Sequence, residues 1–339
     1  MKCATAGGKA MVVWLAEPTA VPVLEIGGTH VTAALVRRPA HGPVTRCWHV
    51  LAGSVVRNSL DAQGSADNLL AAFASAANAL GNEHTGRWGI ALPGPFDYRR
   101  GVGQYQHVGK FENLRGIDVR AELTARLDHT PMAMVFLNDA HAFGIGAGAH
   151  SRTPSRSAMA GRTVCITLGT GIGSSFLEGG LPVTAGPGVP PDGHCHRIGF
   201  QGRPLEETAS RRAIRRAYAA SSGLIARHAD DRQAAECRDM PDVHNIARLA
   251  RGGDSVATAV WEHAFVSLGA AIGPYINEFG AQELLVGGSM TASWDILEPA
   301  LRQGLTLAEA GLRQLPVVRF DGSEEASLVG AAIWAARTP

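Results

Sequence analysis

Short, mainly hydrophobic runs that stop at a turn residue recur along the chain. They occupy residues 21–26, 88–92, 132–137, 163–168 and 283–286, and glycine, proline or asparagine follows each run at once. Apolar runs of this length with such boundaries are typical of strands buried on both faces, so the pattern predicts a largely parallel sheet. Further strands are predicted at residues 31–36, 47–52 and 174–177.

Longer segments with apolar residues at helical spacing alternate with these runs. They cover residues 69–80, 117–127, 140–149, 206–220, 255–279 and 327–336. Residues 186–203 are rich in glycine, proline and histidine, which predicts an irregular loop. Strand, glycine turn and helix in recurring order together predict an α/β fold.

The two halves of the chain begin alike. A strand ends at Gly27-Gly28-Thr29 in the first half and at Gly169-Thr170-Gly171 in the second. We therefore expect two related domains that face a cleft. The smaller is predicted to span residues 20–137 and to regain 327–339, the larger to span 138–326, and residues 1–19 to form a poorly ordered lead-in.

Composition constrains location and partners. Of 339 residues, 45% are hydrophobic and the net charge is +1, as in soluble proteins without a polyanionic partner. Five cysteines without a CxxC pair favour reduced thiols over a disulfide framework. Residues 10–16 have the length of a signal-peptide core but lack a convincing cleavage site, and no apolar stretch approaches the roughly 18 residues of a membrane span. We predict a cytoplasmic protein that contacts neither nucleic acid nor membrane.

The two glycine turns are candidate phosphate sites. Glycines after a strand free backbone N–H groups to converge on phosphate oxygens, and the threonine hydroxyls of Thr29 and Thr170 add donors. The Glu25 carboxylate is placed to hold a Mg²⁺-bound water. Neither turn is a Walker A loop or a convincing dinucleotide fingerprint. Glycine hairpins are also common without a ligand, but two in one chain favour a nucleotide held from both sides.

Asn138-Asp139, at the end of a predicted strand, is the sharpest chemical signal. Ligands of α/β sheets gather at the carboxyl ends of strands. There a carboxylate can orient a substrate hydroxyl and accept its proton during phosphoryl transfer. The alternative is an N-cap for the following helix, a position that favours aspartate. The two roles can coexist.

These motifs, in their order, resemble the ROK family (repressor, open reading frame, kinase) of sugar kinases, a branch of the actin/hexokinase-like ATPases. The resemblance rests on Glu25 to Thr29, Gly89 to Asp97 with its Pro-Gly-Pro segment, Glu112 to Leu114, Val135 to Ala140, Ile166 to Gly173, Leu205-Glu206, Leu285 to Gly288 and Leu328 to Ala332. It implies two actin/hexokinase-like (ribonuclease H-like) α/β domains that flank a cleft.

The resemblance also implies an activity and its residues. A kinase of this family would use ATP and Mg²⁺ to phosphorylate a hydroxyl, the primary 6-OH or its equivalent, of a hexose or hexose-like substrate, with Asp139 as general base. A homodimer is usual. The substrate side would comprise Pro93, Gly94, Asn113, Asn138, Asp139, Asp192, His194 and Glu206. The nucleotide side would comprise Glu25, Gly27, Gly28, Thr29, Gly169, Thr170, Gly171, Gly173, Gly287 and Gly288.

Several positions depart from the family pattern. Glu25 replaces aspartate, His30 replaces lysine or asparagine, and Pro191 replaces a glutamate that would accept hydrogen bonds from sugar hydroxyls. The cysteine triplet of the family's zinc loop is missing. His194, Cys195 and His196 are adjacent and rarely could converge on one ion, so we expect no zinc site. Without the acceptor at Pro191, a modified hexose or a C7-cyclitol (carbasugar) becomes a credible substrate.

Three alternatives remain open. A transcriptional repressor of the family would need a helix-turn-helix ahead of the first turn, for which about 20 residues are too few. A sugar-binding protein without catalytic activity is the second. Polyphosphate in place of ATP is the third, although the sequence contains no dense basic groove.

Overall fold

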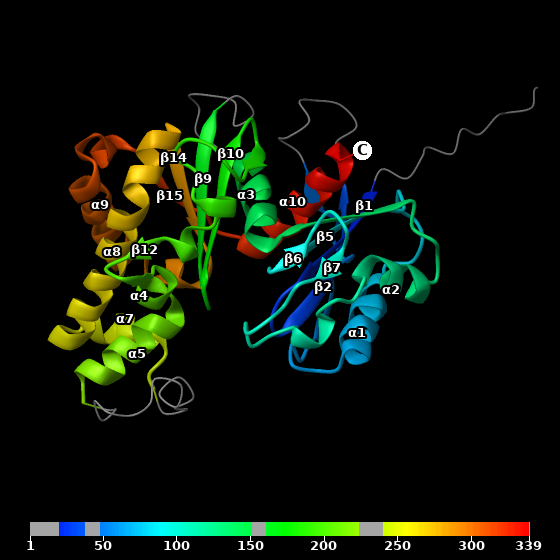
Figure 1. Cartoon of the computed structure of the whole chain (residues 1–339), viewed down its shortest axis with the longest axis horizontal. Helices are drawn as coiled ribbons and strands as arrows, with labels where there is room; N and C mark the ends of the chain where they lie inside the picture. The colour runs from blue at the N-terminus through cyan, green and yellow to red at the C-terminus, as the bar shows by residue number, and fades with distance from the viewer. Residues whose placement is uncertain (1–19, 38–47, 151–160, 224–239, 339) are drawn as a thin grey trace, which may run out of the picture.

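The computed structural model describes residues 20–37, 48–150, 161–223 and 240–338. Two sheets form its framework, one in each half of the chain (Figure 1). The predicted lead-in at residues 1–19 and the start of the predicted strand 47–52 lie outside the described residues. The two-domain division, with its boundaries near residues 137 and 326, stays a prediction.

The first sheet has the order β3-β2-β1-β5-β8, and β4 also pairs with β2. Its central pair β1–β2 is antiparallel, whereas β5 runs parallel to β1 and to β8. Its strands are β1 (Ala20–Ile26), β2 (His30–Arg37), β3 (His49–Val50), β4 (Val56–Ser59), β5 (Arg87–Leu92) and β8 (Ala133–Asn138).

The second sheet repeats this plan in the order β11-β10-β9-β14-β15. A hairpin of β9 and β10 is again followed by strands that run parallel to its first member. Its strands are β9 (Arg162–Leu168), β10 (Ile172–Glu178), β11 (Leu181–Val183), β14 (Glu283–Gly287) and β15 (Val317–Arg319). Two small hairpins stand apart, β6 (Phe96–Asp97) with β7 (Val102–Gly103) and β12 (Gly199–Phe200) with β13 (Arg203–Pro204).

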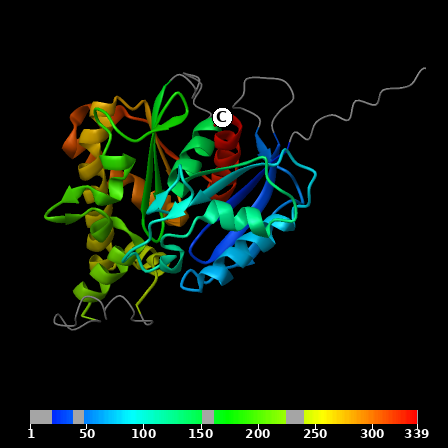
Figure 2. The same ribbon diagram turned by 45° about the vertical axis from the view of Figure 1, so that its right-hand side comes forward.

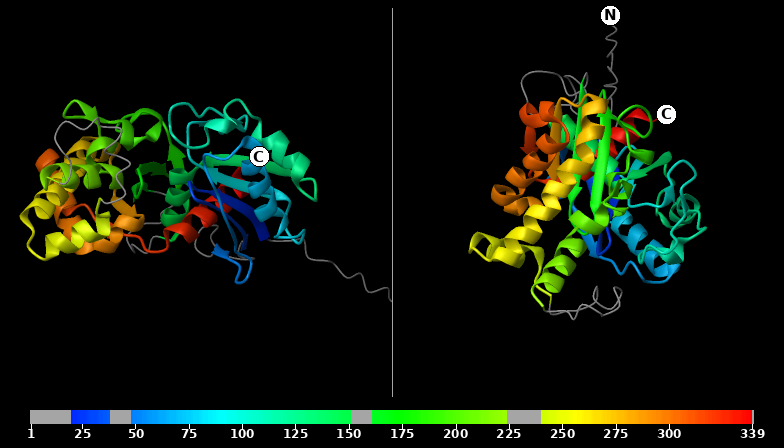
Figure 3. Two further views of the ribbon diagram at one scale, coloured as in Figure 1. Left: turned by 90° about the horizontal axis from the view of Figure 1, so that it is seen from below. Right: turned by 60° about the vertical axis from the view of Figure 1, so that its left-hand side comes forward.

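Helices α3 (Asp139–His150) and α10 (Ser323–Arg337) lie between the two sheets (Figures 2 and 3). Glycines bring their backbones into direct contact: a methyl group on Gly330 would lie 1.8 Å from the carbonyl oxygen of Ala142. On the other side α10 meets β5, where a methyl group on Gly89 would lie 2.2 Å from the Ala331 oxygen. A buried cluster that includes residues of both sheets surrounds this crossing. The two halves therefore share a core.

The outer helices cover the far sides of the sheets. Helices α1 (Ala66–Asn78) and α2 (Val119–Arg126) pack beside the first sheet, and α4 (Glu206–Ala209), α5 (Arg211–Ser221), α7 (Val243–Arg251), α8 (Ser255–Phe279) and α9 (Trp294–Ala308) lie with the second (Figure 1). Capping side chains set several of their starts. Ser65, Asp118, Ser210 and Asp254 each accept a backbone N–H of the first turn, as N-caps do.

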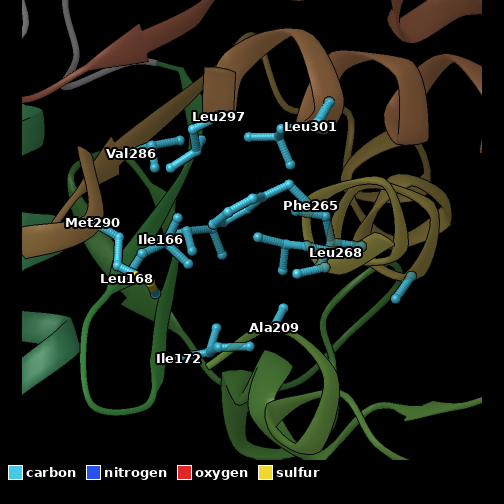
Figure 4. Packing of buried hydrophobic residues seen from close by; sticks show 14 of the residues in the cluster. Ile166, Leu168, Ile172, Ala209, Phe265, Leu268, Val286, Met290, Leu297 and Leu301 are labelled. Atoms are coloured by element: carbon cyan, nitrogen blue, oxygen red, sulfur yellow. The ribbon is translucent and has the colours of Figure 1, made fainter. Parts of the chain in front are cut away.

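Helix α8 lies in the centre of the second half. Its Phe265 and Leu268 face Ile166 of β9 and Val286 of β14 in the largest buried cluster (Figure 4). Within the described residues, α8 is the one helix long and apolar enough to cross a membrane by length and composition. The expectation that no stretch approaches this length was wrong, because α8 is a core helix that is apolar on most of its circumference.

Two predicted segments differ in detail. The helix expected over residues 206–220 breaks at Ser210, whose extended backbone caps α5. The loop expected over 186–203 contains two 3₁₀ turns, Pro191–Gly193 and Cys195–Arg197. Helices α7 and α9 and strands β4, β11 and β15 were not predicted. The three strands are short and are defined by their pairing, whereas α7 and α9 carry apolar residues at helical spacing, so a local signal for these helices was present. Further 3₁₀ turns are Glu112–Leu114, Ser289–Ser293 and Ala310–Gln314.

Candidate functional site

Asp139 lies where β8 passes into α3. Its Oδ1 accepts the Ala140 N–H at 2.9 Å, and Oδ1 of Asn138 accepts the same N–H at 3.0 Å. Asp139 thus accepts an N–H of the first turn of α3, and its role as the N-cap stays a prediction. Burial raises the pKa of the Asp139 carboxyl, while the charge of Lys110 and the helix N–H oppose this shift. A carboxylate that is partly desolvated in this way is a stronger base than an exposed aspartate.

Two tyrosines hold the neighbouring Pro-Gly-Pro segment. The Asn138 amide donates to Tyr98 Oη at 3.0 Å, and Tyr98 Oη donates to the Leu92 oxygen at 3.2 Å. Tyr105 Oη donates to the Pro93 oxygen at 2.8 Å. Burial raises the pKa of both phenols far above the usual value, so both stay protonated as donors. Asn138 and Pro93 therefore keep fixed positions next to Asp139.

The first glycine turn joins β1 to β2. The Gly27 N–H donates to the His30 oxygen at 2.9 Å and closes the turn. Gly28 and Thr29 are exposed at its tip. Burial raises the pKa of Glu25 from 4.5 to about 7, and the negative charges of Asp139 and Glu324 add to this effect. The charge of Arg57 acts in the opposite direction.

The second glycine turn joins β9 to β10 and contacts three other segments. The Arg211 N–H donates to the Gly169 oxygen at 3.1 Å. A methyl group on Gly171 would lie 2.2 Å from Glu206 Oε1, and one on Gly173 would lie 2.8 Å from the Ala140 Cβ. The turn is therefore adjacent to the start of α3, and Glu206 lies against this turn.

Gly288 packs directly on the strand that leads into the second turn. A methyl group there would lie 2.4 Å from the Leu168 oxygen. The Gly288 N–H donates to Ser323 Oγ at 2.9 Å, at the beginning of α10. Gly287 lies against the Phe143 ring. The residues predicted for the nucleotide side in the second half, Gly169, Thr170, Gly171, Gly173, Gly287 and Gly288, are thus brought together.

Three histidines, among them the predicted substrate residue His194, are grouped together. The rings of His194 and His141 are stacked with centroids 6.1 Å apart, and His196 lies 5.2 Å from His194. Burial lowers the pKa of His141 to about 4, and the adjacent His194 adds to this shift. Nε2 of His141 is buried and has no hydrogen-bond partner among the described residues. A bound ligand or a water molecule can supply the hydrogen bond that this nitrogen lacks.

The backbone that carries His194 is anchored to β10. Ser174 Oγ donates to the Gly193 oxygen at 2.6 Å and accepts the Cys195 N–H at 2.8 Å. Burial lowers the pKa of His194, with smaller effects from His196 and Arg197, so its imidazole is neutral near neutral pH. The ring is held in place as a neutral donor or acceptor.

Two predicted substrate residues have other contacts. Asn113 is exposed, and its amide donates to the oxygens of Gln63 and Gly64 at 3.2 and 2.9 Å. Asp192 is exposed and lies 3.9 Å from Arg197. Their assignment to the substrate side stays a prediction.

The cysteine next to His194 is poorly suited to a metal. Burial raises the pKa of the Cys195 thiol to about 12, so it remains protonated. In the part of the chain that the structure describes, no three His, Cys, Asp or Glu side chains are grouped to hold a metal ion.

The carboxylates near the first turn, unlike the Cys195 thiol, suit a metal ion, namely Mg²⁺. The negative charge of Asp139 raises the pKa of Glu25, a repulsion that a divalent cation would offset. Carboxylate oxygens with water are the ligands that Mg²⁺ prefers. Glu25 therefore fits the predicted role of holding a hydrated ion.

The whole chain can now be compared with known proteins. Residues 22–338 match the family model described as "ROK family". The chain belongs to the ROK family. This confirms the family predicted from the glycine turns and the Asn-Asp pair. The fold of this ROK protein also matches solved ROK sugar kinases, which confirms the predicted actin/hexokinase-like α/β class.

Three proteins similar to this ROK protein illustrate the range of proteins that it matches. A glucokinase of Thermotoga maritima is 26% identical over 329 residues, which are 91% of this chain and 95% of the relative. A ROK family glucokinase from Streptomyces griseus in complex with glucose and AMPPNP is 20% identical, with a TM-score of 0.67, and the match covers 94% of this chain and all of the other. A ROK transcriptional regulator, a homologue of the E. coli MLC protein, is also 20% identical with a TM-score of 0.67, and covers 93% of this chain and 78% of the regulator.

Several residues of the site were missed from the sequence. Tyr98 and His141 directly follow the motifs that end at Asp97 and Ala140, so a signal for these two was present, whereas Tyr105 lies between two motifs. Lys110, whose charge acts on Asp139, is one of three lysines in an arginine-rich chain. Arg57 carried no signal, because only the pairing of β4 with β2 brings it to the first turn.

Proposed function

We propose that this ROK protein is a kinase that transfers a phosphoryl group from ATP to a hydroxyl of a hexose or hexose-like alcohol. The observation that carries the proposal is the place of Asp139, a desolvated carboxylate between two glycine turns of equivalent strands. The glucokinase relative of T. maritima and the glucokinase structure with glucose and AMPPNP support this class of reaction. The regulator among the similar structures keeps a binding protein without turnover as the alternative.

In this mechanism Asp139 accepts the proton of the attacking hydroxyl. Its raised pKa makes it a better proton acceptor than an exposed aspartate, provided that it is ionised when the substrate binds. Phosphoryl transfer has a loose transition state, so orientation of the hydroxyl contributes as much as basicity. Asn138, held by Tyr98, supplies the second contact that fixes this orientation.

The nucleotide would bind between the two turns. The backbone N–H groups of Gly28 and Thr29 at the exposed tip of the first turn, and those of Thr170 and Gly171 in the second, would be donors for phosphate oxygens, whereas the Gly169 N–H already donates to the Gly171 oxygen at 3.1 Å. Glu25 would hold Mg²⁺ through water, and the ion supplies charge neutralisation of the phosphates when it is bound. ATP is the donor that the relatives support, and polyphosphate is the competing donor.

The acceptor is a primary hydroxyl equivalent to the 6-OH of a hexose. His194 would bind a neighbouring hydroxyl, and Pro191, which is exposed, offers no carboxylate to that side. The buried Nε2 of His141 supplies a polar atom at the same place. This difference in acceptors favours a C7-cyclitol or a modified hexose over glucose, and we put it forward as the second candidate. The homodimer and the cytoplasmic location stay predictions from the sequence.

An ADP-release assay coupled to a screen of acceptors tests the proposal. Hexoses, aminohexoses and C7-cyclitols would be offered with Mg-ATP and, separately, with polyphosphate, and Asp139→Asn would serve as the inactive control. Transfer from polyphosphate releases no ADP, so in that arm the phosphorylated acceptor would be detected by mass spectrometry. We expect turnover with ATP, abolished by the control substitution, and a better rate with some hexose-like alcohol than with glucose. Acceptor binding by the folded protein without a phosphorylated product from either donor would instead support the non-catalytic alternative.

A further inference from the structure

Three polar side chains from separate segments form a chain of contacts behind the first turn. Arg57 on β4 donates from Nη1 to the two oxygens of Glu324, at the start of α10, at 2.9 and 3.0 Å. Nη2 of Arg57 lies 2.8 Å from Nε2 of His30, and Nδ1 of His30 lies 3.0 Å from Oγ1 of Thr29. The chain of contacts therefore runs from a helix of the C-terminal segment to a hydroxyl of the phosphate turn.

The chemistry of the partners fixes the protons along this chain. Arginine only donates, so Nε2 of His30 must accept, and the imidazole must be neutral with its proton on Nδ1. That Nδ1–H then donates to Thr29 Oγ1. The hydroxyl hydrogen of Thr29 is left to point toward the tip of the turn, where a methyl group on Gly28 would have no described heavy atom within 4 Å. Burial and the charge of Arg57 also lower the pKa of His30, in keeping with a neutral ring.

We propose that Arg57 is a positioning residue for the nucleotide, which holds His30 as the Nδ1–H imidazole so that the Thr29 hydroxyl donates to a terminal phosphate oxygen. The inference rests on the proposed function for the identity of the ligand. A purely stabilising ion pair explains the contacts less well, because Arg57 and Glu324 side chains are 46% and 67% exposed. Pairs that exposed contribute little to stability.

The tautomer of His30 can be observed without any turnover. Two-dimensional ¹H–¹⁵N spectra of the imidazoles distinguish Nδ1–H from Nε2–H rings, and His30→Asn identifies the signals of His30 by their loss. We expect the Nδ1–H form in the wild type and a shift to the Nε2–H or charged form in Arg57→Met. An Nε2–H ring in the wild type, or an unchanged ring in Arg57→Met, would overturn the proposal.

The consequence for the nucleotide is measured as the Kd of AMPPNP with Mg²⁺ by calorimetry. Arg57→Met and Thr29→Val should each weaken binding roughly five- to tenfold, the size expected for one lost hydrogen bond. Because both act through the same hydroxyl, Arg57→Met should add little in the Thr29→Val background. Independent, additive losses in this double-mutant cycle would refute the positioning role.

Arg251→Met is the matched control. Arg251 forms a two-pronged pair with Asp295 at 2.7 and 2.6 Å and is similarly exposed, but its helices α7 and α9 lie on the far side of the second sheet (Figure 1). It should leave both the His30 signals and the AMPPNP affinity unchanged. If the wild type binds no AMPPNP, the proposed function and this inference fail together. If it binds while Arg57→Met binds equally well, the inference alone fails.

Discussion

The two glycine turns occupy equivalent places in two sheets of the same strand plan, yet they are built by different forces. Ionisable groups surround the first: Glu25 near the end of the strand that leads into it, and His30, Arg57 and Glu324 behind it. Close packing defines the second, where Gly173 lies against the side chains of Thr167 and Ala140 and Gly288 lies against the backbone of Leu168, so neither position has space for a side chain. A fold can thus repeat a glycine turn while it relies on charge in one copy and on packing in the other. Substitutions in the first turn should therefore change binding and pH dependence, and those in the second should change stability.

The largest effect is expected at Asp139, where the two turns meet. Asp139→Asn should lower kcat by roughly 10²–10⁴-fold, because it removes a positioned base. Asparagine is also a good N-cap, so the start of α3 should be kept. The measurement is the ADP-release rate with the best acceptor, alongside the melting temperature.

Asp118→Asn is the control for the Asp139 variant. Asp118 caps α2 by accepting the Ala121 N–H at 2.9 Å, outside the site. It should keep full activity. Near-normal turnover in a correctly folded Asp139→Asn protein would show that Asp139 is not the base.

The next effect contrasts Gly288→Ala with Gly28→Ala. Gly288 has φ +93° and its new methyl would meet the Leu168 oxygen at 2.4 Å, so we expect a loss of roughly 2–4 kcal/mol in the free energy of unfolding. At Gly28 a methyl would meet no described atom within 4 Å, and the loss should stay below about 1 kcal/mol. Urea unfolding of both variants measures the difference.

Nucleotide affinity should show the opposite order for these two glycines. Gly28→Ala places a methyl group where phosphate oxygens are expected, so it should raise the KM for ATP more than Gly288→Ala does. Equal losses of stability at the two positions would remove the distinction between a turn built by charge and one built by packing.

Glu25→Gln tests the electrostatic character of the first turn. The pKa of Glu25 is raised from 4.5 in the unfolded chain to about 7 in the folded protein. The folded state therefore binds this proton more tightly, and stability falls as pH rises from 4.5 to about 7. Above about pH 7 the folded state bears the whole free-energy cost of the buried, ionised Glu25 carboxylate. The glutamine variant should be more stable at pH 8, by roughly 1–3 kcal/mol, and its stability should vary less across the window.

The same variant should bind Mg-ATP less well, because the amide cannot hold a hydrated cation as a carboxylate does. Glu178→Gln, on the exposed end of β10, is the control and should change neither property. If Glu25→Gln lowered stability at pH 8, the carboxylate would be stabilising in the folded state, and our account of the first turn would be wrong.

The contrast between the turns also separates what the sequence could predict from what it could not. Glycine after an apolar strand is a local signal, so both turns and Asp139 were placed on the correct elements. The forces around each turn depend on distant partners. Arg57 reaches His30 only through the pairing of Thr32 with Arg57 across β2 and β4, and Glu324 only through the position of α10.

Local reasoning failed in a similar way along residues 206–220. The apolar spacing there suits one helix, but Ser210 adopts an extended backbone and caps α5. The break allows Glu206 to lie against Gly171, while the Arg211 N–H reaches the Gly169 oxygen. Contact with the second turn thus overrides helix propensity, a tertiary effect that spacing along the chain does not reveal.

The smallest effect concerns the histidines. They test whether the predicted substrate side relies on polar contacts, as the first turn does, or on packing, as the second turn does. His194→Ala should raise the KM for the acceptor about fivefold, in line with the loss of one hydrogen bond worth on the order of 1 kcal/mol.

His141→Asn separates hydrogen bonding from ring stacking, because it keeps a polar group but removes the stacked ring. The pKa of His141 is lowered from 6.5 to about 4, so its charging in the unfolded state costs the fold stability as pH falls from 6.5 to 4. His141→Asn should therefore lessen the loss of stability in that window. If His194→Ala changes the acceptor KM, His194 is one of the groups that bind the acceptor. If His141→Asn changes only the stability in acid, His141 serves in packing. Loss of acceptor binding in both variants would instead mean that the stacked pair acts as one unit, with the unpaired Nε2 of His141 directed at the substrate.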